Sequence, residues 1–181
     1  GAESVALAYR SHIQVIDTRS LKATHTITDA HVCGTTDVDF NPLRPEYLAS
    51  SGNDRFAKIW DLRKPDEPLV KVLAGHSHWT SCVRYNHVHD QLLASGGTDN
   101  AVNMWRVASC AKAPWLGGGE GVDGDDDDPP DVNVKVIDQH EDSVYGVAWG
   151  AASPWVCCSL SYDGRVILSH VPSAEKYKIL L

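Results

Sequence analysis

A spacing between histidine, serine and aspartate that occurs three times is the feature that most constrains this chain of 181 residues. In each of three units a histidine stands 23 residues before an aspartate, and a serine stands four residues before that aspartate. The sets are His31, Ser50 and Asp54; His76, Ser95 and Asp99; and His140, Ser159 and Asp163. Matches at fixed offsets indicate a structural repeat.

The unit from His76 to Trp105 indicates what one repeat folds into. Two apolar runs, Cys82–Tyr85 and Leu92–Ser95, precede the turn signal Gly96–Asn100, and an alternating run ends at Trp105. Short runs of this kind, separated by Gly, Asp and Asn, predict antiparallel strands. The first two units lie 45 residues apart, which is the period of a WD40 blade, a four-stranded sheet. The sequence therefore predicts an all-β protein, a WD40 β-propeller.

The repeat divides the chain into four predicted parts. They are a partial blade of three strands (1–29), a blade (30–75), a blade with an insertion (76–139) and a C-terminal blade (140–181). No leading strand precedes Ser4–Tyr9, so we expect the chain to enter in the middle of a blade. We expect Tyr177–Leu181 to be the fourth strand of the last blade. The count is three full four-stranded blades plus three strands of a fourth, part of a full-length propeller with seven blades.

An acidic insertion separates the third strand of one blade from its fourth. The third repeat begins 64 residues after the second, whereas the second begins 45 residues after the first. The extra residues fall at about 112–131. Residues 120–131 hold seven acidic residues and no Lys or Arg. They therefore account for most of the net charge of −8 that the chain carries. Such a composition predicts a disordered loop, with Val132–Ile137 as the delayed strand. The rest is nearly neutral, which argues against nucleic-acid binding.

Other patterns bear on location and cofactors. No apolar run is long enough to cross a membrane, and no signal peptide is visible. The five cysteines form no CxxC, which favours reduced thiols in the cytosol, most of them small buried hydrophobes. His76 with His78 and His87 with His89 suggest a metal site, but no Cys or carboxylate completes either pair, so we expect no metal and no cofactor.

The repeated polar residues resemble the structural hydrogen-bond network of WD40 blades. In that family a Trp indole donates to the Ser, the Ser donates to the His, and the His donates to the Asp. The resemblance implies complete sets that also contain Trp60 and Trp105, whereas Ser169 replaces the Trp in the last blade. A hydrolase is the alternative for Ser, His and Asp. It needs an exposed nucleophile and an oxyanion site, and three copies in strands and turns favour scaffolding instead. We therefore expect that the protein is not an enzyme.

Longer stretches resemble one WD-repeat family, whose members interact with the endosome-associated recycling (EARP) and Golgi-associated retrograde (GARP) tethering complexes. These proteins are also called tumour-suppressing subtransferable candidate WD-repeat proteins. The stretches include Ser77–Trp79, Val83–His87, His140–Tyr145 and Ser159–Arg165. The resemblance is to the C-terminal half of the proteins in this family. The resemblance implies an adaptor in endosomal recycling, endosome-to-Golgi transport and secretory-granule maturation, peripheral at the trans-Golgi network and endosomes. The alternative is a substrate receptor of a ubiquitin ligase or of peroxisomal import.

Residues that differ between copies are the candidates for binding a protein partner. WD40 propellers commonly bind partners at the end that carries the turn before the structural Asp. By that rule the candidates are Asn53, Trp79, Thr98, Tyr145 and Tyr162. Fewer than four complete blades also leave two uncovered ends, which invite pairing. We therefore expect that this fragment self-associates, or that further chain closes the ring.

Overall fold

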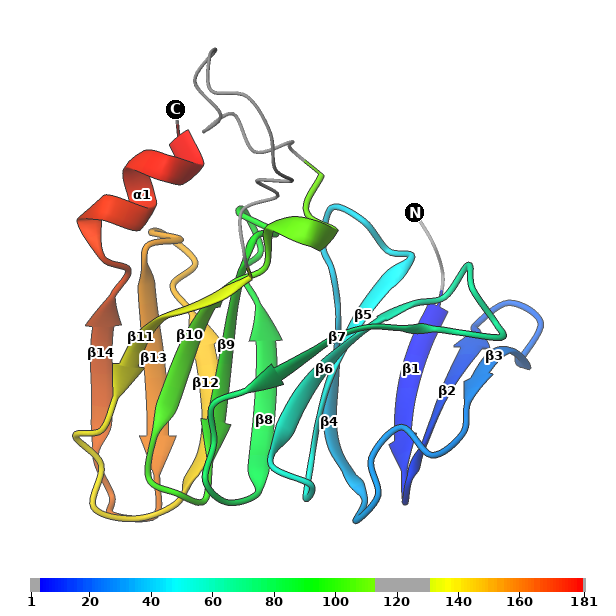
Figure 1. Ribbon diagram of the computed structural model, residues 1–181, viewed down its shortest axis with the longest axis horizontal. Helices are drawn as coiled ribbons and strands as arrows, with labels where there is room; N and C mark the ends of the chain where they lie inside the picture. Colours follow the sequence, from blue (N-terminus) through cyan, green and yellow to red (C-terminus); the bar gives the residue numbers. More distant parts are fainter. Residues whose placement is uncertain (1–3, 113–130, 181) are drawn as a thin grey trace, which may run out of the picture.

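The computed structural model describes residues 4–112 and 131–180, and in this part of the chain four antiparallel sheets stand side by side (Figure 1). The two middle sheets each contain four strands. One consists of β4 (Thr35–Phe40), β5 (Tyr47–Gly52), β6 (Phe56–Asp61) and β7 (Leu69–Ala74). The other consists of β8 (Thr80–Tyr85), β9 (Leu92–Gly97), β10 (Val102–Arg106) and β11 (Val132–Ile137). Both have the strand order of propeller blades, in which consecutive strands are neighbours.

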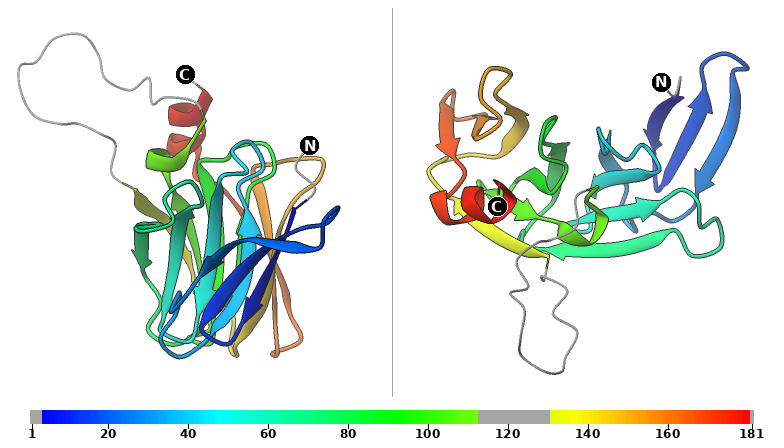
Figure 2. Two further views of the ribbon diagram at one scale, coloured as in Figure 1. Left: turned by 90° about the vertical axis from the view of Figure 1, so that its right-hand side faces the viewer. Right: turned by 90° about the horizontal axis from the view of Figure 1, so that it is seen from above.

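The two outer sheets each contain three strands in the described residues. The first consists of β1 (Ser4–Tyr9), β2 (His12–Asp17) and β3 (Lys22–Ile27). The last consists of β12 (Val144–Trp149), β13 (Val156–Ser161) and β14 (Val166–His170). Seen from above, the four sheets fan out in an arc, with β4, β8 and β12 toward one side (Figure 2). The all-β, partial-propeller fold that the repeat predicts is confirmed.

Within the described residues, no strand stands in the leading place of the first sheet, as the sequence predicts. β1 packs against β4 in the same way that β5 packs against β8 and β9 packs against β12. β1 therefore takes the place of the second strand of a blade. β2 and β3 take the third and fourth places.

The prediction of a fourth strand at Tyr177–Leu181 is wrong, because the chain forms helix α1 (Ser173–Leu180) there. In residues 4–112 and 131–180 the last sheet therefore has three strands, and two sheets, not three, have all four strands. Pro172 ends the strand segment, and its carbonyl accepts the N–H groups of Glu175 and Lys176. Ala, Glu, Lys and Leu favour a helix, and burial of Glu175 beside Arg106 fixes it at this position.

The hydrophobic core lies between neighbouring sheets. Three alternating pairs of side chains pack there: Val38/Phe40, Val83/Tyr85 and Val147/Trp149. Each pair contributes to a buried cluster that also contains residues of an adjacent sheet, such as Ile59 for Val83 and Cys82 for Val147. Full burial of one such side chain contributes about 1.5–3 kcal/mol, so each sheet depends on its neighbours.

The acidic insertion predicted at about 112–131 lies almost entirely outside the described residues. A short helix, η1 (Ala108–Cys110), follows β10, and β11 resumes at Val132 as predicted. The two borders of the insertion are fixed. Asp131 accepts hydrogen bonds from the backbone N–H and hydroxyl of Ser109, and the backbone N–H of Lys112 donates to Asp90.

Three of the cysteines, Cys82, Cys110 and Cys157, are buried thiols, as the sequence suggests, whereas Cys33 is exposed. Burial raises the pKa of the Cys157 thiol to about 12, so this group stays protonated and unreactive. No helix in the described part of the chain is long and apolar enough to cross a membrane.

Candidate protein-binding face

The two ends of the blades differ in what they carry. One end holds the turns at residues 53–55, 98–101 and 162–165 and the segments that precede β4, β8 and β12; we call it the turn face (the lower end in Figure 1). The other end holds α1 and the loops at residues 41–46, 86–91 and 150–155; we call it the helix face (the upper end in Figure 1). All the predicted site residues can be placed relative to these two ends.

The second blade contains a complete network of the expected kind. The Trp60 indole N–H donates to Ser50 Oγ at 2.7 Å. Ser50 Oγ lies 2.7 Å from His31 Nε2, and His31 Nδ1 lies 2.7 Å from Asp54 Oδ1. Because the hydroxyl oxygen already accepts the indole proton, its own proton points to Nε2, and Nδ1–H donates to the carboxylate. Lys58 Nζ also donates to Asp54, at 2.8 Å.

The third blade repeats this network and extends it. Trp105 Nε1 and His76 Nε2 both lie 2.9 Å from Ser95 Oγ, and His76 Nδ1 lies 3.0 Å from Asp99 Oδ1. Asn103 Nδ2 approaches His76 Nε2 at 3.0 Å, and a second amide, from Asn133 of β11, donates to Asn103. The sequence comparison between repeats missed these two asparagines because they have no counterparts in the other blades.

The last blade contains a shorter version. His140 Nδ1 lies 3.1 Å from Asp163 Oδ2, and Nε2 lies 2.8 Å from Ser159 Oγ. Ser169, which replaces the Trp, is buried. Asp163 also accepts the backbone N–H groups of Glu141 and Arg165, so its carboxylate fixes the turn as well as the histidine.

The protonation states agree with a structural network. Burial lowers the pKa of His31, which keeps the imidazole neutral near pH 7. Burial works to raise the pKa of Asp54, but hydrogen bonds from Lys58 and His31 outweigh it and lower that pKa. Ser50, Ser95 and Ser159 are buried in the sheets and cannot reach a substrate. The repeated Ser, His and Asp residues therefore do not have the exposed nucleophile that a hydrolase needs.

Three of the four histidines considered for metal binding have other contacts. Both ring nitrogens of His76 belong to the network, and His78 Nδ1 lies 2.5 Å from Thr98 Oγ1. His89 stacks on Trp155 with ring centroids 4.2 Å apart, on the helix face. Within residues 4–112 and 131–180, no cluster of three or more His, Cys, Asp or Glu side chains could hold a metal ion.

Three of the five candidate partner-binding residues occupy equivalent positions on the turn face. The backbone N–H groups of Asn53, Thr98 and Tyr162 donate to the carbonyls of the residues that lead into β4, β8 and β12. The backbone geometry is the same, but the side chains differ. The Asn53 amide donates to the Cys33 carbonyl, Thr98 meets His78, and Tyr162 is 72% exposed.

The aromatic candidates form two exposed pairs on neighbouring blades. Trp79 is 50% exposed and lies against the His78 ring, with centroids 5.0 Å apart. Tyr145 is 48% exposed and lies against Tyr162, with centroids 4.7 Å apart. His78 is a member of this group that sequence reasoning considered only as a metal ligand. The two pairs place large aromatic rings at the surface, and Trp and Tyr are enriched among the residues that dominate binding to other proteins.

Comparison with known proteins agrees with this description. Residues 1–105 match the family described as EIPR1 beta-propeller, and residues 132–168 match the WD domain, G-beta repeat. The chain is 43% identical over 191 residues to EARP and GARP complex-interacting protein 1 of Homo sapiens, covering 98% of this chain and 48% of the relative. It is 38% identical over 176 residues to EARP-interacting protein 1 of Caenorhabditis elegans, covering 91% and 47%. It is 37% identical over 173 residues to WD repeat-containing protein DWA2 of Arabidopsis thaliana, covering 93% and 46%.

The blades and their buried networks define a WD-repeat propeller protein. Within that class, the chain belongs to the EIPR1 beta-propeller family. It spans about half the length of the curated relatives that it matches.

Proposed function

We propose that this chain is part of a non-catalytic adaptor that binds vesicle-tethering complexes. Relatives from Homo sapiens and Caenorhabditis elegans are named for interaction with EARP, and the former also for GARP. An adaptor of this kind acts in endosomal recycling, endosome-to-Golgi transport and secretory-granule maturation. Its place is the cytoplasmic side of the trans-Golgi network and of endosomes, where it is held through its partners rather than by insertion into the membrane.

The observation that supports the proposal best is the pair of aromatic contacts on the turn face. Trp79 and Tyr162 are large and exposed, and each contacts a neighbouring ring, so both present apolar area that a partner can cover. Trp and Tyr are the residue types that dominate binding energy in protein interfaces. Asn53 and Thr98 extend the same face with polar groups that can form the rim of an interface.

The proposal is tested by affinity purification of the tagged full-length protein from cells, followed by mass spectrometry. The double variant Trp79→Ala, Tyr162→Ala should lower recovery of tethering-complex subunits by about tenfold, since hot-spot truncations cost more than 1.4 kcal/mol. Tyr177→Ala is the matched control, because this tyrosine is also exposed but lies on α1 at the opposite end. Equal recovery with all variants would contradict the role of the turn face.

The same experiment distinguishes the adaptor from the alternative function, a substrate receptor. Recovery of ubiquitin-ligase or peroxisomal-import subunits without any tethering subunits would replace the adaptor with a substrate receptor. Circular dichroism of the double variant should match that of the unchanged protein, since both residues are exposed.

A further inference from the structure

The exposed pair Tyr145 and Tyr162 on the turn face lies beside acidic residues of the same blade. The two rings are 4.7 Å apart between centroids. The Tyr162 N–H donates to the Ser143 carbonyl at 3.1 Å, and the Ser161 hydroxyl donates to the Asp142 carbonyl at 2.7 Å. These two hydrogen bonds hold the backbone of Asp142 next to the turn that carries Tyr162.

The acids before β12 are not required by the blade, because the equivalent residues of other blades are not acidic. Ser77 and Glu141 each donate a backbone N–H to the network aspartate of their own blade, at 2.8 and 2.9 Å, so they are equivalent. The next residues, His78 and Asp142, are then equivalent as well. By the repeat spacing, the second blade has Val32–Cys33 at these two places. The fold therefore does not explain the carboxylates of the last blade.

The charge around the tyrosine pair is negative. Among residues 138–145 and 162–165, which the structure describes throughout, three exposed acids stand against one Lys or Arg, which is Arg165. The Arg165 guanidinium already pairs with Glu141 at 2.8 Å. Asp142 is exposed and has no cation as a partner within the described part of the chain. Its carboxylate therefore attracts a basic group of a ligand.

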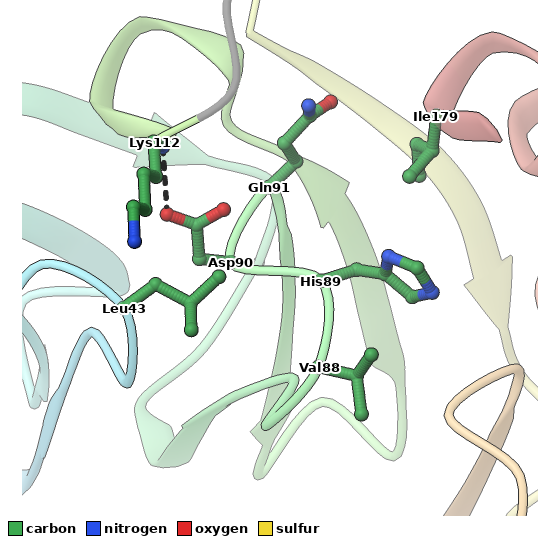
Figure 3. A pocket seen from close by; sticks show the side chains of 7 residues that line it. All are labelled: Leu43, Val88, His89, Asp90, Gln91, Lys112 and Ile179. Carbon is green, nitrogen blue, oxygen red and sulfur yellow. Dashed lines mark hydrogen bonds between the residues drawn. The ribbon is translucent and has the colours of Figure 1, made fainter. Parts of the chain in front are cut away.

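The pocket on the helix face has no such preference for charge. It encloses about 370 Å³ (Figure 3). Its lining holds one lysine and one aspartate, and the backbone N–H of Lys112 donates to the Asp90 carboxylate. The other lining residues are uncharged or histidine: Leu43, Val88, His89, Gln91 and Ile179. The charge that can select a partner therefore lies on the turn face.

Tyrosine rings beside a carboxylate select a cation. The face of an aromatic ring is negative, so a guanidinium or ammonium group placed on it is attracted. An arginine side chain can lie on a ring while its N–H groups donate to a carboxylate. A neutral or acidic side chain has neither of these two attractions.

We propose that Tyr145, Tyr162 and Asp142 together recognise an arginine or lysine in a basic segment of a partner protein. The cation lies on the tyrosine rings and donates to the Asp142 carboxylate. This inference rests on the proposed function, because it assigns the chemistry of the partner that the turn face binds.

The first test uses a short acetylated and amidated peptide in which arginines alternate with serines. It is titrated into the isotope-labelled chain and followed by NMR. We expect shifts at the backbone amides of Asp142, Tyr145 and Tyr162, and none at Val88 on the helix face. Added salt should weaken binding, because the Asp142 carboxylate is exposed. The same peptide with glutamine in place of arginine should not shift these amides.

Variants separate the two contacts. Asp142→Asn removes the charge and Tyr162→Ala removes a ring, and each should weaken binding by about threefold or more. Tyr162→Phe keeps the ring and should bind like the unchanged chain. Asp66→Asn is the control for charge, because Asp66 is exposed on the β6–β7 loop of another blade.

The acidic residues at 120–131 can also attract this peptide, so binding is measured only from the turn-face amides. The proposal is overturned by no shift at those amides, by equal shifts with the glutamine peptide, or by binding that Asp142→Asn leaves unchanged. Shifts confined to Lys112 and Asp131, which border the acidic insertion, also overturn it.

Affinity purification of the full-length protein separates this inference from the proposed function. Asp142→Lys should lower recovery of tethering-complex subunits by about tenfold, because it places like charges together. If Asp142→Lys recovers them fully while the Trp79→Ala, Tyr162→Ala double variant loses them, the adaptor function stands and the cation site is wrong. If the unchanged protein recovers none, the adaptor function is wrong, and the peptide titration still decides whether the site binds a cation.

Discussion

His76 shows how a single residue connects the strands of a blade. Its Nδ1 is hydrogen-bonded to Asp99 in the turn, and its Nε2 is hydrogen-bonded to Ser95 on β9 and Asn103 on β10. Ser95 in turn accepts the indole N–H of Trp105. Most of these groups are removed from water, so each depends on its partner for a hydrogen bond.

Replacing Ser95 by Ala tests this dependence. The change removes the acceptor of the buried Trp105 N–H, and we expect the free energy of unfolding to fall by about 1–3 kcal/mol. Urea unfolding followed by tryptophan fluorescence measures it. Ser77→Ala is the control, because Ser77 is an exposed neighbour of His76, and it should change stability little. Equal stability of the two variants would show that the network does not stabilise the fold.

Titrating residues of the networks make the fold sensitive to acid. Burial lowers the pKa of His31 below 6.5, so the unfolded chain binds a proton that the folded chain does not. Its contribution to stability is complete above pH 6.5 and is lost as the pH falls toward the lowered pKa. Burial works to raise the pKa of Asp163, but hydrogen bonds from Glu141, Arg165 and His140 lower it to about 2. That contribution is complete above pH 3.8 and is lost toward 2.

We therefore expect the melting temperature to fall in two windows, one just below pH 6.5 and one below pH 3.8. Thermal melts followed by circular dichroism across both windows measure this. Asp163→Asn should reduce the loss in the lower window and keep the upper one. A melting temperature that stays constant as the pH falls below 6.5 would contradict the role of His31.

At the scale of elements, α1 is fixed by a buried ion pair. Arg106 Nε on β10 lies 3.2 Å from Glu175 Oε2, and both side chains are mostly buried. Glu175→Gln leaves the Arg106 guanidinium without this carboxylate, and we expect a loss of about 3 kcal/mol and faster hydrogen exchange in α1. Lys178→Gln removes a more exposed partner of Glu175 and should cost about 0.5 kcal/mol or less. Unchanged exchange in Glu175→Gln would show that α1 is held by other contacts.

The sequence predicts strands where turn residues separate short apolar runs, and strands form at Ser4–Tyr9, at three places between Thr80 and Arg106, and at Val132–Ile137. It fails at α1 because Tyr177–Leu181 alternates like a strand, whereas Glu175 and Ile179 are placed by contacts with distant residues, and no local pattern reveals those contacts. The buried networks could be predicted because they repeat. The Tyr145–Tyr162 contact and the pocket at Gln91 could not, since each depends on residues that occur once.

At the scale of the whole molecule, the arc of four sheets ends in two apolar faces. On β1, Ala6 packs inward, so Val5, Leu7 and Tyr9 lie on the opposite, exposed face. On β14, Ile167 packs inward, and Val166 and Leu168 are exposed on the other side. Blades bury such faces against neighbouring blades, and soluble proteins seldom leave apolar patches of this kind uncovered.

We expect the 181-residue chain to self-associate through these two faces. The β1 face of one copy would cover the β14 face of another, which removes both apolar surfaces from water. Sedimentation velocity over a range of concentrations measures the association. Leu7→Glu and Leu168→Glu should each shift the chain toward the monomer, because a charge buried in such a contact is unpaired. Val136→Glu on the outer strand β11 is the control and should sediment like the unchanged chain. A monodisperse monomer at all concentrations would contradict self-association and show that the two faces are tolerated in water.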